Sequence, residues 1–146
     1  MVLHLLECHE VLIKKAPQAI QQHLIQAVHN ILKVCLDSKV QIKIELFHLM
    51  KGLMRVCTPQ MVVDVLLPEL PEATMVAPKN AKMCEDVINF VILALLTFPS
   101  LEFDLFQICS AIAPSLLHAK RRVRQAAFES MAIIHQVSTE AGTPKL

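Results

Sequence analysis

Apolar residues recur along the first part of the chain with the spacing of amphipathic helices. Over Pro17–Leu36 they fall on one stripe, with a period close to 3.6 residues. The Asp37-Ser38 pair interrupts this pattern, and a second helical pattern follows over Val40–Val56. Upstream, Leu3–Lys14 has the pattern of a helix remnant. The first part of the chain is therefore predicted to be helical, with short breaks.

Proline and hydroxyl side chains mark the boundaries of the next helices. Thr58-Pro59 predicts a helix start, because threonine is a common N-cap and proline fits the first turn. The short apolar helix that follows is expected to end at Pro68, and a polar connector runs to about Ala81. Lys82–Phe98 then has the pattern of a strongly apolar helix.

Similar signals divide the last third of the chain. Ser100 is predicted to cap a helix that runs to about residue 113, where Pro114 kinks or ends it. The last helix is predicted to begin near Lys120. The residues from Ser138 onward are polar, and we expect them to fray.

The alternation of helix and break recurs with a period of about 40 residues, the length of HEAT and armadillo repeats. The segment that begins at Ile42 aligns with the segment that begins at Val123, two such periods later. The positions that coincide are Ile42 with Val123, Lys43 with Arg124, Phe47 with Phe128, Met50 with Met131 and Leu53 with Ile134. Stacked helix pairs bury faces that one pair cannot bury alone. The sequence therefore predicts an all-α fold, an α-solenoid of HEAT-like antiparallel helix pairs without a sheet.

The predicted array is a single domain. Its repeats are expected at residues 16–57, 58–98 and 99–137, with a remnant at 1–15 and a tail at 138–146. The N-terminal helix pair is expected to expose an apolar face and to self-associate, because Leu3, Leu6 and Ile13 provide no polar cap. The side chains expected to be buried between helix pairs are Ile42, Leu46, Leu53, Val87, Val91, Leu95, Val123, Ala127, Met131 and Ile134.

The composition of the 146 residues excludes several kinds of functional site. The two glycines, Gly52 and Gly142, are too few and too far apart for phosphate loops, dinucleotide fingerprints or nucleophile elbows. The longest segment without a charged residue, residues 16–32, has 17 residues and contains a proline, and the next two have 15 residues each, whereas a membrane span needs about 20 apolar residues. The formal net charge of +1 gives no overall attraction to nucleic acid or membranes. We expect neither partner, and no cofactor.

Cysteine and histidine residues give little basis for a metal site or a catalytic centre. The five cysteines are too far apart for a Cys-x-x-Cys zinc pair and are interpreted as reduced thiols of a cytoplasmic protein. His4, Cys8 and His9 could form a metal trio, but a closed site needs four ligands, which favours ordinary histidines at a helix end. No nucleophile has a base near it in the sequence, so we expect no metal and no enzymatic activity.

The one cluster of charge is Lys120-Arg121-Arg122, at the turn before the last predicted helix. It is either a solvated turn or part of a binding surface. Nucleic acid is a weak interpretation, because the chain has no Trp or Tyr on which bases could stack. Arg124 is expected to be structural, since the arginine at this position of HEAT-type pairs usually points along the ladder between repeats.

Three segments resemble one family of helical-repeat proteins. Leu116-Leu-His-Ala-Lys-Arg-Arg-Val-Arg-Gln-Ala-Ala-Phe-Glu-Ser-Met131 is similar to the last helix pair of a TOG domain. Leu95-Leu-Thr-Phe-Pro-Ser-Leu-Glu-Phe-Asp-Leu105 and Val28-His-Asn-Ile-Leu-Lys-Val-Cys-Leu-Asp-Ser-Lys39 strengthen the likeness. Over Ala16–Gln136 the chain resembles the crescerin family, the TOG-array regulators of axonemal microtubules. This resemblance implies the C-terminal half of a TOG domain, which contacts tubulin along one edge.

The resemblance also implies which residues form the edge. TOG domains build it from the turns within helix pairs, here Asp37–Gln41, the connector near Pro78–Lys82, and Pro114–Arg122. Basic side chains on these turns suit the acidic surface of tubulin. The candidate contacts are Lys39, Lys79, Lys82, Lys120, Arg121 and Arg122, whereas the opposite turns carry Pro99, Ser100, Glu102 and Asp104. Two functions stay open: a tubulin- or microtubule-binding module of the cytoskeleton and cilium, or a HEAT scaffold for another protein.

Overall fold

The computed structural model describes residues 23–36, 38–72 and 80–142. All regular structure in these ranges is helical and none is strand, so the all-α prediction is confirmed there. The chain divides into two compact units between Val65 and Leu66. The predictions for Leu3–Lys14, for its apolar face, for the His4, Cys8 and His9 group, and for Lys79 lie outside the described residues.

The first unit contains α3 (Leu24–Leu36) and α4 (Val40–Val56), which pack against each other. The apolar stripe predicted from the sequence is the buried face of α3. Ile42 is only partly buried, contrary to the prediction, because it lies in the first turn of α4 among exposed residues. The buried side chains of α4 are Leu46, Leu49, Met50, Leu53 and Met54.

The short helix α5 (Pro59–Leu66) begins where the sequence predicts. The N–H of Met61 donates a hydrogen bond to Thr58 Oγ1 over 3.2 Å, so Thr58 is its N-cap. After Leu66 the chain tightens into a 3-10 turn, η1 (Leu67–Glu69), because Pro68 has no N–H for a further α-helical bond.

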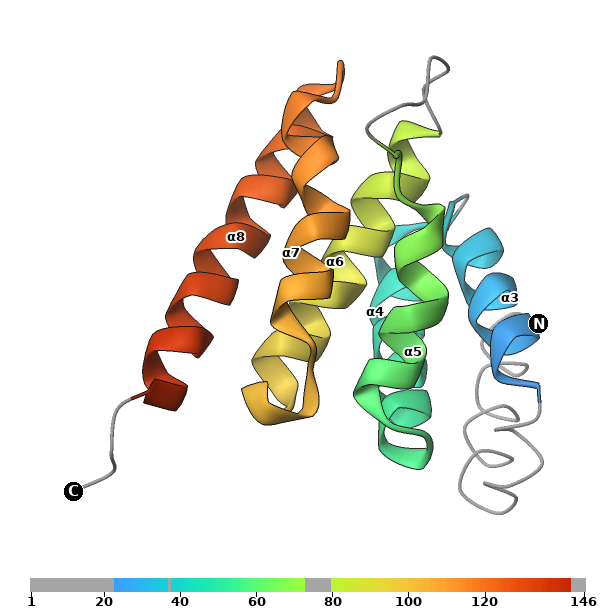
Figure 1. Cartoon of the computed structure of the whole chain (residues 1–146). Helices are drawn as coiled ribbons and strands as arrows, with labels where there is room; N and C mark the ends of the chain where they lie inside the picture. The colour runs from blue at the N-terminus through green and yellow to red at the C-terminus, as the bar shows by residue number, and fades with distance from the viewer. Residues whose placement is uncertain (1–22, 37, 73–79, 143–146) are drawn as a thin grey trace. The chain divides into compact units, whose positions relative to one another are not determined.

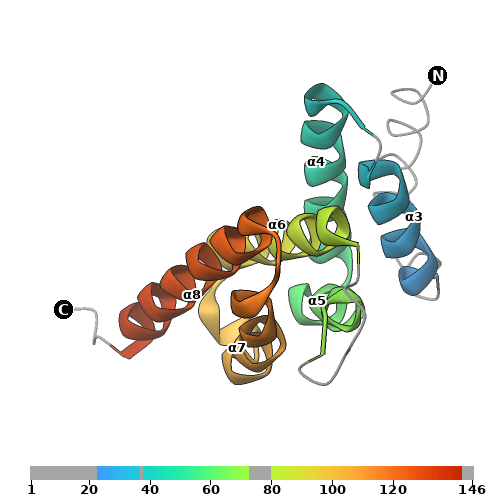
Figure 2. The ribbon, with the colours of Figure 1, turned by 90° about the horizontal axis from the view of Figure 1, so that it is seen from above.

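The second unit contains the long helices α6 (Ala81–Thr97) and α8 (Arg121–Gly142) and the shorter α7 (Leu105–Ile112). Figures 1 and 2 show that α6 and α8, which pack against each other, run in the same direction, whereas α7 runs in the opposite direction. Met131 of α8 is only partly buried, contrary to the prediction, because it packs beside the partly exposed Cys109 of α7. The predicted core residues that are buried in this unit are Val87, Val91, Leu95, Val123, Ala127 and Ile134.

The start of α7 differs from the prediction. Ser100 opens a 3-10 turn, η2 (Ser100–Glu102), and does not cap an α-helix. Asp104 is the N-cap instead, and its carboxylate accepts the N–H of Gln107 over 3.0 Å. A carboxylate at this position also complements the positive end of the helix dipole, which a serine hydroxyl does not.

The ends of α7 and α8 are fixed by different local interactions. Pro114 ends α7, and the chain continues in a third 3-10 turn, η3 (Ala113–Leu117). Fraying from Ser138 is not observed, because α8 continues to Gly142. Gln136 and Glu140, one turn apart, are joined by a 3.1 Å hydrogen bond, and such pairs stabilise exposed helices.

Candidate partner-binding edge

The turn between α7 and α8 is organised around His118. The N–H of His118 donates to the carbonyl oxygen of Ser115 over 3.2 Å and closes η3. The His118 imidazole is buried, and its Nδ1 accepts the N–H of Lys120 over 3.0 Å. This imidazole therefore satisfies the N–H of the residue that directly precedes α8, whereas an N-capping Ser or Asp would accept an N–H within the first helical turn. An Nδ1 that accepts a hydrogen bond carries no proton.

Arg124 closes the same turn from within α8. Its Nη1 donates to the carbonyl oxygens of His118, at 2.7 Å, and of Ala119, at 2.9 Å. Hydrogen bonds from a charged donor are stronger than neutral ones, so this pair holds the turn firmly. Arg124 is structural, as expected, but its partner is its own turn and not a ladder between repeats.

Lys120, Arg121 and Arg122 extend from this turn into solvent. No ion pair joins their side chains to another residue in the described part of the chain. They lie at the N-terminal end of α8, whose first turn contains no acidic residue. Cations at that position oppose the helix dipole, at a cost of about 0.3–1 kcal/mol each at low ionic strength. The stability of the helix therefore does not explain this cluster.

Lys82 lies at the same end of the second unit. Asn80 caps α6 by accepting the N–H of Lys82 over 3.0 Å and that of Met83 over 3.4 Å, and the Lys82 side chain is exposed. Figure 1 shows that α6 and α8 begin at the same end. We refer to Lys82, Lys120, Arg121 and Arg122 together as the cationic end of the second unit.

The opposite end of this unit carries carboxylates. Because α7 runs against α6 and α8, its start lies away from the cationic end (Figure 1). Glu102 and Asp104, both exposed, lie at that start. Acidic residues at a helix N-terminus stabilise the helix, so helix stability alone explains the position of these two residues. Within the second unit, the start of α7 thus carries charge of the opposite sign to the Lys120–Arg122 cluster at the start of α8.

The other two candidate contacts are not placed with this group. Lys39 is exposed and immediately precedes α4, but it belongs to the first unit. Lys79 lies outside the described residues. A continuous edge that includes all six cations therefore stays a prediction.

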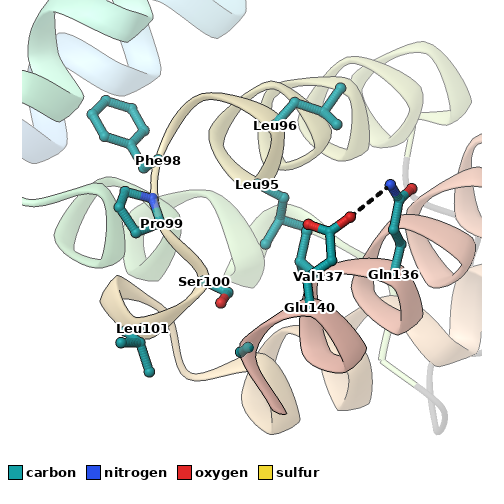
Figure 3. Close-up of a pocket in the computed structure, with 10 residues that line it drawn as sticks. Leu95, Leu96, Phe98, Pro99, Ser100, Leu101, Gln136, Val137 and Glu140 are labelled. Carbon is teal, nitrogen blue, oxygen red and sulfur yellow. Dashed lines mark hydrogen bonds between the residues drawn. The ribbon is translucent and has the colours of Figure 1, made fainter. Parts of the chain in front are cut away.

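A groove of about 540 Å³ lies where the last turns of α8 approach the segment that follows α6 (Figure 3). On its wall, Gln136 Nε2 donates to Glu140 Oε1 over 3.1 Å. Glu140 is the only ionisable group among the lining residues, so they supply no acid–base pair. The lining residues are Leu95, Leu96, Phe98, Pro99, Ser100, Leu101, Gln136, Val137, Glu140 and Ala141.

The described residues contain no group of three His, Cys, Asp or Glu side chains that could hold a metal ion. The described cysteines are free thiols, and Cys109 is the one among them that is partly exposed. Burial raises the pKa of the Cys57 thiol, which keeps it from forming the nucleophilic thiolate. None of the described helices has the length and hydrophobicity to span a membrane.

Comparisons with known proteins identify the relatives of these helical repeats. No protein-family model matches the chain. The TOG array regulator of axonemal microtubules protein 1 of Homo sapiens is 36% identical over 129 residues, and that of Mus musculus is 37% identical over 133 residues. The resemblance to TOG-array proteins is confirmed. These alignments cover 88% and 91% of this chain, which spans 7% of the length of each relative.

A solved structure supports the TOG-like fold. It comes from work on crescerin, described as using a TOG domain array to regulate microtubules in the primary cilium. The match has a TM-score of 0.81 at 34% identity, and it covers 91% of this chain and 53% of the solved chain. The predicted fold class, a TOG-like α-solenoid of HEAT-like helix pairs, is therefore confirmed.

Proposed function

We propose that this chain is a non-enzymatic, TOG-like module that binds tubulin or microtubules through the turns within its helix pairs. The curated relatives are named as regulators of axonemal microtubules, and crescerin is described as acting in the primary cilium. We extend these roles to this chain and propose that it acts on ciliary microtubules as part of the cytoskeleton. The observation that carries the proposal is the cationic end of the second unit.

The cationic end has the electrostatic properties that an acidic protein partner requires. Lys82 and the Lys120–Arg122 cluster are exposed at the starts of two helices. The N-termini of those helices add partial positive charge in the same place. A carboxylate on a partner would therefore be attracted by both the side chains and the helix ends. Such exposed charges mainly raise the association rate, and salt weakens their effect.

The extent of the binding surface follows from the repeat arrangement. The chain covers 53% of the solved crescerin chain, and we propose that it corresponds to the C-terminal half of a TOG domain. The TOG resemblance implies that the turns with Lys39 and Lys79 belong to the same edge as Lys82, Lys120, Arg121 and Arg122. We therefore propose that all six cations contact the partner and that Lys120, Arg121 and Arg122 contribute most.

A binding experiment with matched variants tests the proposal. The 146-residue chain is mixed with tubulin in gel filtration and with microtubules in co-sedimentation. We expect Arg121→Gln with Arg122→Gln to weaken binding roughly tenfold at low salt and less at high salt. Lys33→Gln with Arg55→Gln removes two other exposed cations and is expected to leave binding unchanged.

The same experiment separates the tubulin module from the alternative function. A parent chain that binds neither tubulin nor microtubules favours a HEAT scaffold for another protein. Equal weakening by both double variants indicates a general charge effect, and the assignment to the cationic end is then wrong.

A further inference from the structure

The turn before α8 has an unusual distribution of polar and apolar side chains. Ser115 is fully buried and His118 is 8% exposed, whereas Leu117, between them in the sequence, is 90% exposed. Ser115 Oγ and His118 Nε2 have no hydrogen-bond partner among the described residues. Burying polar atoms while exposing a leucine costs stability. Local folding energetics therefore do not account for the position of Leu117.

The hydrogen bonds of the turn hold the backbone that follows Leu117. His118, the next residue, is held by Ser115 on one side and by Lys120 on the other. Arg124 adds two hydrogen bonds to the carbonyl oxygens that follow Leu117. The backbone that carries the leucine is thus fixed before any partner binds. A fixed group loses little conformational entropy on binding, which favours affinity.

Leu117 also lies next to the strongest charges of the cationic end. Lys120, Arg121 and Arg122 follow it within five residues, and all three are exposed. This combination presents one apolar side chain with cations beside it. Tight protein interfaces commonly have this form, with a buried apolar anchor and a charged rim. An anionic membrane fits less well, because a single leucine offers little area for insertion among lipids.

We propose that Leu117 is the apolar anchor of the cationic end and inserts into an apolar depression on an acidic protein surface. Carboxylates around that depression pair with Lys120, Arg121 and Arg122. This inference rests on the proposed function, in which the acidic protein is tubulin. Arg124 and His118 then act as positioning residues, because they fix the turn without touching the partner.

The test compares two leucines that have the same exposure. Leu117→Ser removes the proposed anchor, and Leu101→Ser is the matched control, because Leu101 is also 90% exposed and lies in a 3-10 turn at the opposite end of the second unit. The Kd of the 146-residue chain for tubulin is measured over a series of salt concentrations. Burial of a leucine side chain predicts that Leu117→Ser raises Kd by about tenfold to a hundredfold. Leu101→Ser should leave Kd unchanged, and Leu117→Met should retain tight binding.

The salt dependence distinguishes an anchor from a further electrostatic effect. Leu117→Ser should leave the dependence of Kd on salt unchanged, whereas Arg121→Gln with Arg122→Gln should reduce it. If the serine variants bind equally while the arginine variant is weaker, the anchor is wrong and the proposed function stands. If the parent chain does not bind tubulin, both proposals fail. Binding to phosphatidylserine vesicles that Leu117→Ser abolishes would overturn the assignment to a protein partner.

Discussion

Replacing Arg121 and Arg122 by glutamine should stabilise the fold while it weakens binding. Both arginines lie at the N-terminal end of α8, whose first turn has no acidic residue. Because each cation there costs about 0.3–1 kcal/mol, the double substitution should raise the free energy of unfolding by about 0.6–2 kcal/mol. Other contributions are small, since both side chains are exposed and glutamine has nearly the helix propensity of arginine.

Urea denaturation followed by circular dichroism measures this gain. It should shrink with added salt, because the screening length falls from about 10 Å at 0.1 M to about 3 Å at 1 M. The control is Lys33→Gln with Arg55→Gln, which removes two cations from the last turns of α3 and α4. Cations are favourable at those positions, so this control should lose stability. The opposite signs separate the position of a charge from the number of charges.

An unfolding free energy for the arginine variant that is unchanged or lower than that of the parent would refute this reasoning. It would mean that Arg121 and Arg122 do not destabilise the fold, so that no partner is needed to explain them. A gain that persists in 1 M salt would point to helix propensity instead of electrostatics.

Two other predictions concern the interior. Replacing Leu95, which is 3% exposed, by alanine should lower the free energy of unfolding by about 2–5 kcal/mol. A loss below about 0.5 kcal/mol in urea denaturation would place Leu95 outside the core. The pKa of Cys57 is raised by burial from 9.0, so its thiol favours the folded state at lower pH, and this contribution is lost as pH rises through the folded pKa. We therefore expect stability to fall above pH 9 less steeply in Cys57→Ala than in the parent, and parallel curves would contradict this.

The helices were predictable wherever one strong signal marked each boundary. The bounds of α4 agree with the sequence pattern, because Asp37-Ser38 precedes it and Thr58-Pro59 follows it. The start of α7 was not predictable, since Ser100 and Asp104 are both common N-caps within one turn of each other. The carboxylate of Asp104 is the group that accepts the capping hydrogen bond, which the sequence alone does not reveal.

The candidate site was predictable in its charges and not in its support. Lys82 and Lys120 could be identified from the sequence as basic residues at turns, and the directions of α6 and α8 bring their turns to one end. The role of His118 could not be identified, because no sequence pattern marks a histidine whose imidazole accepts the N–H of the residue two positions later. The exposure of Leu117 follows from that same turn and has no signature in the sequence.

Among the described helices, the starts of α4 to α8 divide into two kinds. Thr58, Asn80 and Asp104 cap α5, α6 and α7 with side-chain oxygens, as is usual for helix N-termini. Lys39 precedes α4 without a side-chain cap, and α8 follows Lys120, whose own N–H donates to the His118 imidazole.

Both exceptional starts carry cations that the TOG resemblance assigns to the tubulin edge. Native sequences depart from local rules mainly where function requires it. The departures at α4 and α8 are independent of the resemblance, because they come from caps and charges within this chain. They therefore support a binding role for these two turns. For the cations of α8 they also lead to a specific prediction. A variant with an Asp N-cap and a neutral first turn should be more stable and should bind less.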